Sequence, residues 1–509
     1  MAVSILNNVI GPVMPGSSSS HTAGPYHIAK LFRGFAGLLP EKVVFTFAPG
    51  SSISECCVEQ GSDLALIMGI LGLPLTDSRF KEARSLAREA GVEILFERKP
   101  FAEAIHPNSI KIEAELGFGS VLSAIADSTG GGAFLMRQLN GQPVKLDGGM
   151  NYLFIEASDA SAEALFSGCE AALSFSRTPD KCFILAESAS PFSSELIEKL
   201  RKAEAVRDIK RADAVFFPPV GGMLYADAAG MVCFAEENAL TLGEAALEFE
   251  AALLGKSKEE LNQAMDERLC VMEAAVALGL SADSPQMFLL RPSAAAIMAA
   301  EKAGRLAIGG IHTRAAARAM AAMQVNSGQG IVCAAPTGGS AGVLPGVLVT
   351  MLEDMKLPRE RVLRAMWAAG AVGWVLAERG TFAAEVCGCQ VEIGAAGAMA
   401  AAAVVDSVGG RASDAANAAA IAFQNAMGLV CDLVQATVEL PCHTRNASFA
   451  SQAFICADLV LGGYLNPIGL DSTVDAVYSC GRMLPSELRC TSLGGIAVAP
   501  EALSMTRLK

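Results

Sequence analysis

Residues 215 to 509 form a long alanine-rich segment in which apolar residues recur at helical spacing and loops are marked by glycine and proline. Strand-like runs nearly vanish there, so this segment predicts a large all-α domain. Its longest charge-free apolar stretches, at 393–405 and 365–377, end at acidic residues and are shorter than the about 20 residues that a bilayer-spanning helix needs. We expect both stretches to lie inside a large soluble core.

The N-terminal part of the chain shows two other sequence patterns. Residues 1–148 mix strand-like runs at 42–48 and 92–96 with helical stretches and glycine-rich turns, which predicts an α/β (α+β) domain. Residues 149–214 follow the order strand, helix, strand, strand, helix, strand, which is the ferredoxin-like layout of small ACT-like domains that bind amino acids. The sequence therefore predicts three domains: 1–148, 149–214 and 215–509.

Charge excludes several classes of partner. The 509 residues carry 39 basic and 53 acidic side chains, for a formal net charge of −14, and no local basic patch is visible. Such a chain repels phosphate backbones and anionic lipid, so we expect neither nucleic acid nor a membrane as partner. The N-terminal residues show no basic region and no small-residue cleavage signal, which favours a cytoplasmic protein.

The chain contains 14 cysteines, which in a reducing compartment are buried thiols, catalytic thiols or metal ligands. Ordinary buried thiols are the expectation for eight of them: Cys56, Cys57, Cys169, Cys182, Cys233, Cys270, Cys456 and Cys480. Cys389, Cys431 and Cys442 differ because each lies near the end of a helical run, beside glycine or proline, where the helix field lowers a thiol pKa. Three thiolates from separate loops would form a cradle for an iron–sulfur cluster, with ordinary buried thiols as the alternative.

The stretch PGSSSSHTAGP, residues 15–25, offers several short hydroxyl side chains and one histidine between glycines and prolines. Hydroxyl donors and loop N–H groups gathered in one segment would bind a carboxylate, and His21 would add a hydrogen bond or carry a proton. A flexible serine-rich linker is the alternative interpretation.

Several segments together resemble one enzyme family. GPVMPGSSSSHTAGP is similar to the N-terminal signature of iron–sulfur-dependent L-serine dehydratases, and AIHPNSIKIEA, residues 104–114, resembles the HPN motif of the same domain. Segments 325–346, 387–403, 428–447 and 491–500 resemble the motifs of the family's alpha domain in the same order. The resemblance covers nearly the whole chain, with the beta and alpha domains fused.

The resemblance implies a lyase of amino-acid catabolism and gluconeogenesis that converts L-serine to pyruvate and ammonia by β-elimination. A homodimer is expected from the alanine-rich helical faces and from a site shared by two domains. It implies a [4Fe-4S] cluster held by Cys389, Cys431 and Cys442, with one iron lacking a protein ligand and acting as a Lewis acid, and no pyridoxal phosphate. Cys387, which precedes the GCQ motif, is expected to be a neighbour of the cluster.

The resemblance and the chemistry of these segments together give the remaining site residues. His106 is the first candidate for proton transfer and His21 the second, with a structural role as the alternative for His106. Arg445 would pair with a carboxylate or balance the charge of the cluster. The expected substrate-binding residues are Ser17, Ser18, Ser19, Ser20, Thr22, Asn108, Thr337, Ser340, Arg445 and Asn446.

Three departures from the family pattern leave the substrate open. Gln60 stands where the family commonly has histidine, segment 433–437 is altered, and the chain ends without the terminal cysteine that in some members folds back onto the open iron. These changes permit β-elimination from another small amino or hydroxy acid, such as L-cysteine with release of sulfide. A non-catalytic cluster protein that senses an amino acid is a further alternative.

Overall fold

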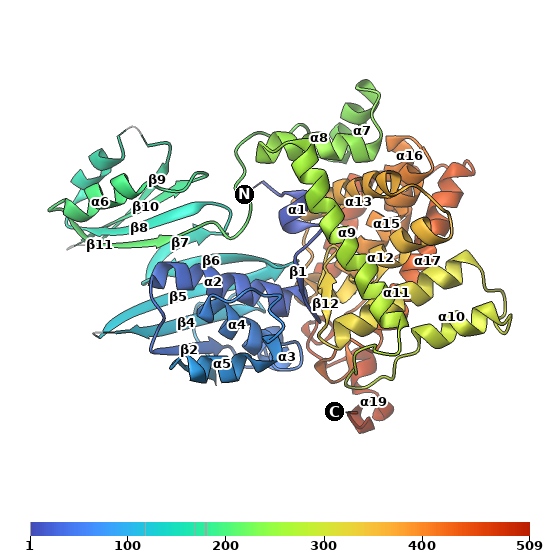
Figure 1. Ribbon diagram of the computed structural model, residues 1–509, viewed down its shortest axis with the longest axis horizontal. Helices are drawn as coiled ribbons and strands as arrows, with labels where there is room; N and C mark the ends of the chain where they lie inside the picture. Colours follow the sequence, from blue (N-terminus) through green and yellow to red (C-terminus); the bar gives the residue numbers. More distant parts are fainter. Residues whose placement is uncertain (1, 118, 168, 179–180, 509) are drawn as a thin grey trace.

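The computed structural model describes residues 2–117, 119–167, 169–178 and 181–508. Two sheets with their helices lie beside a helical body, and the N-terminus lies close to the junction (Figure 1). The six-stranded sheet has the order β3-β2-β4-β5-β6-β7, with β2 and β3 parallel and all other neighbours antiparallel. Its strands are β2 Lys42–Phe47, β3 Glu93–Arg98, β4 Ser109–Leu116, β5 Ser120–Gly130, β6 Ala133–Leu139 and β7 Gln142–Leu146.

Helices of the same part of the chain pack on one face of this sheet. They are α2 Gly24–Ala36, α3 Ser52–Cys56, α4 Ser62–Leu71 and α5 Ala83–Glu89. Helix α2 buries Ile28 and Phe32 in a core shared with Phe45 of β2 and Ile112 of β4. The strands predicted at 42–48 and 92–96 are confirmed, and the antiparallel strands over 109–146 are additional.

The four-stranded sheet has the order β11-β8-β10-β9 and is antiparallel throughout. The strands are β8 Asn151–Ala157, β9 Ala172–Thr178, β10 Lys181–Ser188 and β11 Val206–Ala212, and helix α6 is Ser194–Lys202. These strands and α6 match the predicted pattern. The first predicted helix is instead a short 3-10 helix over Ala160–Phe166, because Phe166 is its one deeply buried anchor among the side chains described.

The helical body is organised around α15, which is buried along its whole length and packs against α13, α16 and α17. The apolar stretch Cys389–Ser407 is long and apolar enough to cross a membrane, but every residue of it is buried in this body. Glycine allows the close approach: a Cβ at Gly394 would lie 2.3 Å from the Cβ of Ala426. The helices are α1 Ile5–Asn8, α7 Ala228–Glu237, α8 Leu242–Leu254, α9 Lys258–Leu280, α10 Ala294–Lys302, α11 Ile311–Ser327, α12 Val343–Glu353, α13 Arg359–Arg379, α14 Ala384–Cys387, α15 Ile393–Ser407, α16 Ala412–Gln424, α17 Cys442–Leu461, α18 Leu470–Arg482 and α19 Pro500–Ser504.

The first residues of the chain belong to the helical body. Ile5 and Ile10 are fully buried in its core, and the carboxylate of Glu250 accepts hydrogen bonds from the N–H groups of Ile5 and Leu6 at 2.9 Å each. Strand β1, Val13–Pro15, then pairs antiparallel with β12, Ile331–Cys333. This pairing holds the serine-rich stretch that follows at the junction between the six-stranded sheet and the helical body.

Candidate active site

The serine-rich stretch is buried and hydrogen-bonded. Every residue from Ser17 to Thr22 is at most 5% exposed, and Ser19–Ala23 form a π-helical turn that leads into α2. The Nδ1 atom of His21 lies 3.2 Å from Ser18 Oγ and 3.1 Å from Ser20 Oγ, and its Nε2 atom lies 3.1 Å from Ser52 Oγ. The flexible-linker interpretation is therefore wrong, and burial lowers the pKa of His21, which favours its neutral form.

The stretch also contacts α11 and the loop PTGGSAG, residues 336–342, of the helical body. The N–H of Gly338 donates to Ser19 Oγ at 3.2 Å, and Asn326 Nδ2 donates to the carbonyl of Ser17 at 2.9 Å. Gly338 has no room for a side chain, since a Cβ there would lie 2.8 Å from the Ser17 carbonyl oxygen. The serine-rich stretch and the loop of Gly338 therefore pack directly against each other.

The substitution Gly338→Ala tests this contact. The added methyl group forces the two loops apart, and overpacking of this kind costs about 1–3 kcal/mol. We expect a lower unfolding midpoint in urea together with a raised KM, because the serine loop moves. A matched Gly222→Ala variant, which has open space around its Cβ, should leave both quantities unchanged. Equal KM values for Gly338→Ala and the parent would show that the contact between the serine-rich stretch and the Gly338 loop does not shape the site.

The three predicted cluster cysteines face one small buried cavity. Cys389 begins a 3-10 turn before α15, Cys442 is the first residue of α17, and Cys431 lies in the loop between α16 and α17. All three are at most 5% exposed. The cavity is lined by Ser18, Ser20, Gln60, Gly339, Ala384, Cys389, Glu392, Cys431, Leu433, Val438, Cys442 and Cys490.

The donor set fits a thiolate-bound metal cluster. The sulfurs of Cys389 and Cys431 and a carboxylate oxygen of Glu392 all lie within 4.8 Å of one another. The sequence predicted lowered pKa values for these thiols, but hydrogen bonds with the neighbouring thiols of Cys389 and Cys490, together with burial, raise the pKa of Cys431, and burial raises that of Cys442. Bound metal reverses this balance, since it favours deprotonated ligands.

Two buried glutamates complete the site, and the sequence analysis missed both. Glu385, on α14, is 1% exposed and accepts hydrogen bonds from Asn108 Nδ2 at 2.8 Å and from Ser20 Oγ at 3.3 Å. Burial raises the pKa of Glu385 to about 8. Burial also raises the pKa of Glu392, which contacts Thr337. The available signal was the presence of two acidic residues in the apolar segment around Cys389.

His106, the first candidate for proton transfer, does not line the cysteine cavity in the part of the chain described. It is half-buried, and its Nδ1 atom accepts a hydrogen bond from the N–H of Asn108 at 3.1 Å. Its side chain lines a neighbouring pocket that also contains Ser52 and Glu385. His106 therefore lies next to the site, in the neighbouring pocket, and does not face the cysteine cavity.

The residues predicted to bind substrate from the helical body are mostly engaged with protein. Asn446 donates to the carbonyls of Gly339 and Cys442, both at 2.9 Å, and accepts from the N–H of Gly342. Arg445 pairs with Asp432 at 3.0 Å. The hydroxyls of Thr337 and Ser340 lie 3.1 Å apart. These four side chains hold the loops of the cavity, and Arg445 also places positive charge near Cys389 and Cys442.

Several buried polar atoms at the site have no hydrogen-bond partner within the described chain. They are Oε1 of Gln60, Oγ of Ser17 and Oδ1 of Asn108. Leaving such an atom unpaired costs about 1–3 kcal/mol. Of the three residues, Gln60 lines the cysteine cavity, so its Oε1 atom is the one placed to pair with a polar ligand. Gln60 is 1% exposed, its Nε2 donates to the carbonyl of Ala436 at 3.3 Å, and Thr22 Oγ1 donates to its carbonyl at 2.7 Å.

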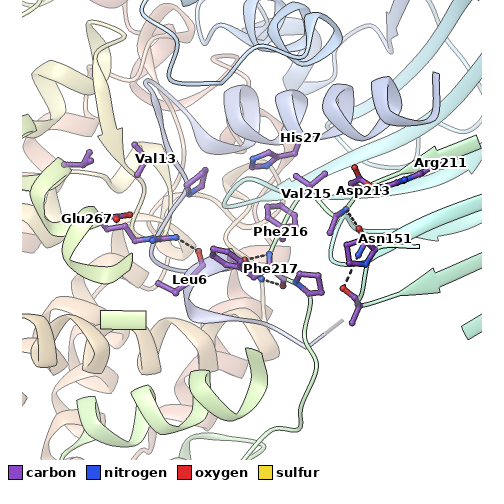
Figure 2. Close-up of a pocket in the computed structure, with 18 residues that line it drawn as sticks. Leu6, Val13, His27, Asn151, Arg211, Asp213, Val215, Phe216, Phe217 and Glu267 are labelled. Atoms are coloured by element: carbon purple, nitrogen blue, oxygen red, sulfur yellow. Dashed lines mark hydrogen bonds and ion pairs between the residues drawn. The ribbon is translucent and has the colours of Figure 1, made fainter. Parts of the chain in front are cut away.

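A larger cavity of about 890 Å³ lies elsewhere, between β11, the N-terminal segment and α9 (Figure 2). Its polar groups are already paired: Asn151 bonds the carbonyls of Ser188 and Ala189, Arg211 pairs with Asp213, and Arg268 donates to the carbonyl of Ile10. No predicted site residue lines it. The small cysteine cavity is therefore the candidate active site.

Comparison with known proteins agrees with this choice. The sequence pattern described as "Serine dehydratase alpha chain" matches residues 222–497, which is more than half of the chain and contains all three predicted cluster cysteines. The chain belongs to the serine dehydratase alpha chain family. Dehydratases are lyases, so this member is an enzyme of the lyase class.

Relatives of this dehydratase carry matching names. The "Probable L-serine dehydratase, alpha chain" of Bacillus subtilis is 40% identical over 265 residues, which is 52% of this chain and 88% of the relative. The L-serine dehydratase alpha chain of Peptoniphilus asaccharolyticus is 34% identical over 51% of this chain and 90% of its own. L-serine dehydratase TdcG of Escherichia coli is 35% identical over 35% of this chain and 40% of its own.

Proposed function

We propose that this dehydratase converts L-serine to pyruvate and ammonia by iron–sulfur-dependent β-elimination. One observation carries the proposal. Three buried thiols from separate loops of the helical body line one cavity together with the serine-rich stretch that precedes α2. The names of the relatives support L-serine as substrate.

In this proposal Cys389, Cys431 and Cys442 hold a [4Fe-4S] cluster, and pyridoxal phosphate is not used. When bound, the cluster supplies a Lewis acid that stabilises the departing hydroxyl group of the substrate. Arg445 offsets part of the negative charge of the thiolates, because its guanidinium lies near Cys389 and Cys442. Asn446 fixes the start of α17 and therefore the position of Cys442.

The unpaired polar atoms assign the ends of the substrate. A carboxylate only accepts hydrogen bonds, so it matches the hydroxyl donors of the serine-rich stretch, where Ser17 Oγ has no partner among the described residues and Ser18 lines the cavity. An ammonium group only donates, so it matches the free Oε1 of Gln60. This arrangement orients the substrate by both ends.

Ser20 is the point at which a proton can leave the cavity. Its hydroxyl lines the cavity and contacts both His21 Nδ1, at 3.1 Å, and Glu385 Oε2, at 3.3 Å. A carboxyl with a pKa of about 8 is present in both protonation states near neutral pH, which suits a general acid–base group. We therefore assign proton transfer to Glu385 and His21 through Ser20, and a positioning role to His106.

Elimination from L-cysteine is the second candidate, and Gln60 favours it. Gln60 and Leu433 both line the cavity, and Gln60 Nε2 donates to the carbonyl of Ala436. Two departures from the family pattern, Gln60 and segment 433–437, therefore lie on the same side of the cavity. Gln60 cannot carry a proton at neutral pH, and a thiol leaving group needs less protonation than hydroxide.

An anaerobic assay of the reconstituted full chain tests the proposal. We expect cluster-like visible absorbance, about four irons per chain as in a [4Fe-4S] cluster, and pyruvate formation from L-serine. Parallel assays with L-cysteine, following sulfide, decide between the two substrates. A protein that binds the cluster but turns over neither amino acid would favour the sensor alternative. A colourless protein would overturn the cluster assignment.

Three broader assignments accompany this function as proposals. The strand order β11-β8-β10-β9 supports a ferredoxin-like, ACT-like regulatory domain at residues 149–214. Composition supports a cytoplasmic enzyme acting on a small amino acid, without nucleic-acid or membrane partners. A homodimer is expected from the alanine-rich helical faces, and light scattering of the purified chain checks it.

A further inference from the structure

A fourth thiol, that of Cys490, faces the cavity of the three predicted cluster ligands. Cys490 is 6% exposed and follows the 3-10 turn Ser486–Leu488 of the helical body. Its thiol is in hydrogen-bonding contact with the thiol of Cys431. The two backbones are also paired, since Cys490 N–H donates to the Cys431 carbonyl at 3.0 Å and Cys431 N–H donates to the Leu488 carbonyl at 2.9 Å. The position of Cys490 is therefore fixed relative to a proposed ligand.

The loop around Cys490 is held in place against its own backbone preference. Cys490 and Ser492 have φ values of +59° and +58°, in the left-handed region that costs a non-glycine residue about 1–2 kcal/mol. Hydrogen bonds compensate: Ser52 Oγ donates to the Cys490 carbonyl at 2.8 Å, and Ser492 Oγ donates to the Leu433 carbonyl at 2.7 Å. The conformation turns the Cys490 side chain toward the cavity.

We propose that Cys490 is the resting-state ligand of the iron that Cys389, Cys431 and Cys442 leave free. The inference rests on the proposed function only in requiring a [4Fe-4S] cluster at this cavity. Glu392 is the competing donor, because its carboxylate also lies near Cys389 and Cys431. Sulfur is the preferred donor of an iron–sulfur cluster, and Glu392 is already bonded to Thr337, so Cys490 is the better match.

The Cys490 sulfur also has polar neighbours on the side of the six-stranded sheet. Its Sγ lies within 4.8 Å of both a ring nitrogen of His21 and the Sγ of Cys56. Displacement of Cys490 by substrate would release its sulfur as a thiolate, which keeps the electron pair of the broken bond. His21 and Cys56 then offer hydrogen-bonding groups to the released thiolate. Cys490 thus protects the cluster at rest and yields to substrate.

The test compares the reconstituted full-length parent with Cys490→Ser and Cys490→Ala. Each protein is treated anaerobically with limiting ferricyanide, and the growth of the paramagnetic three-iron cluster signal is followed together with iron content. An iron without a thiolate cap leaves first, so we expect both variants to lose it at least about tenfold faster than the parent, the lower limit for a disturbed metal site. Cys456→Ala, which removes a buried thiol of α17 outside the cavity, should match the parent.

The outcomes separate this inference from the proposed function. Equal rates of iron loss in the parent and in a folded Cys490→Ser variant, while the parent still forms pyruvate from L-serine, would overturn the inference alone. The inference would also be overturned if the parent bound a separate zinc ion and the variants Cys490→Ser and Cys56→Ser lost that zinc ion but kept an unchanged cluster. A parent that assembles no cluster would overturn both proposals. Faster iron loss in Cys490→Ser with unchanged circular dichroism would establish the ligand.

Discussion

Cys431→Ala should lose both the visible absorbance of the cluster and pyruvate formation. The sulfur of Cys431 lies within 4.8 Å of the sulfur of Cys389 and contacts the thiol of Cys490, so it is the central member of the thiol group. Its removal leaves Cys389 and Cys442 as the only ligands that would stay bound when substrate displaces Cys490. Metal-assisted stabilisation of a leaving group is worth several kcal/mol, and a loss of about 4 kcal/mol lowers the rate about 10³-fold. Iron content and the anaerobic L-serine assay measure the two effects.

Cys456→Ala is the matched control for this experiment. Cys456 is also a buried thiol of the helical body, 1% exposed on α17, but it does not line the cavity. The control should keep the cluster and the activity at a small cost in stability. If Cys431→Ala retained parental iron content and turnover, Cys431 would not be a cluster ligand and the proposed active site would lie elsewhere.

The three cysteines could be predicted from sequence because the signal is local. Each one stands at a loop beside glycine or proline within a recognisable motif, and the resemblance fixes its role. The all-α character of the C-terminal segment was predictable for a similar reason, since alanine-rich helical periodicity extends over the whole segment. The β4–β7 strands were not predicted, although β4 alternates buried and more exposed residues over most of its length.

Cys490 and Glu385 could not be assigned to the site from sequence. Cys490 is 48 residues from the nearest predicted ligand, Cys442, and only the backbone pairing with Cys431 brings it to the cavity. Glu385 gains its importance from burial and from contacts with Ser20 and Asn108, which come from the other body of the protein. Such contacts are a property of the packed chain, so spacing along the sequence carries no signal for them.

Glu385→Gln should lower kcat for L-serine by about 10² to 10⁴-fold, the usual contribution of a general acid–base group. The amide keeps the size of the side chain and can still accept from Asn108 Nδ2, so the loops should remain in place. The parent should show an inflection in kcat near pH 8, where this carboxyl titrates, and the variant should lack it. A parental pH profile in the variant would assign proton transfer to His21 alone. Glu250→Gln, a buried glutamate that caps α1 far from the cavity, should keep the inflection.

The same group should make the stability of the cluster-free chain depend on pH. The pKa of Glu385 is raised from its ordinary value of 4.5 to about 8, so between these values the native state holds a proton that the unfolded state releases. Stability therefore falls as pH rises through this window, by up to about 1.4 kcal/mol per pH unit, and levels off above it. Glu385→Gln has no titrating group at this position. The difference in free energy of unfolding in urea, variant minus parent, should therefore increase with this slope from pH 5 to about pH 8. A constant difference between the two proteins over that range would show that the buried carboxyl is already ionised, and proton transfer through Ser20 would then begin from the carboxylate.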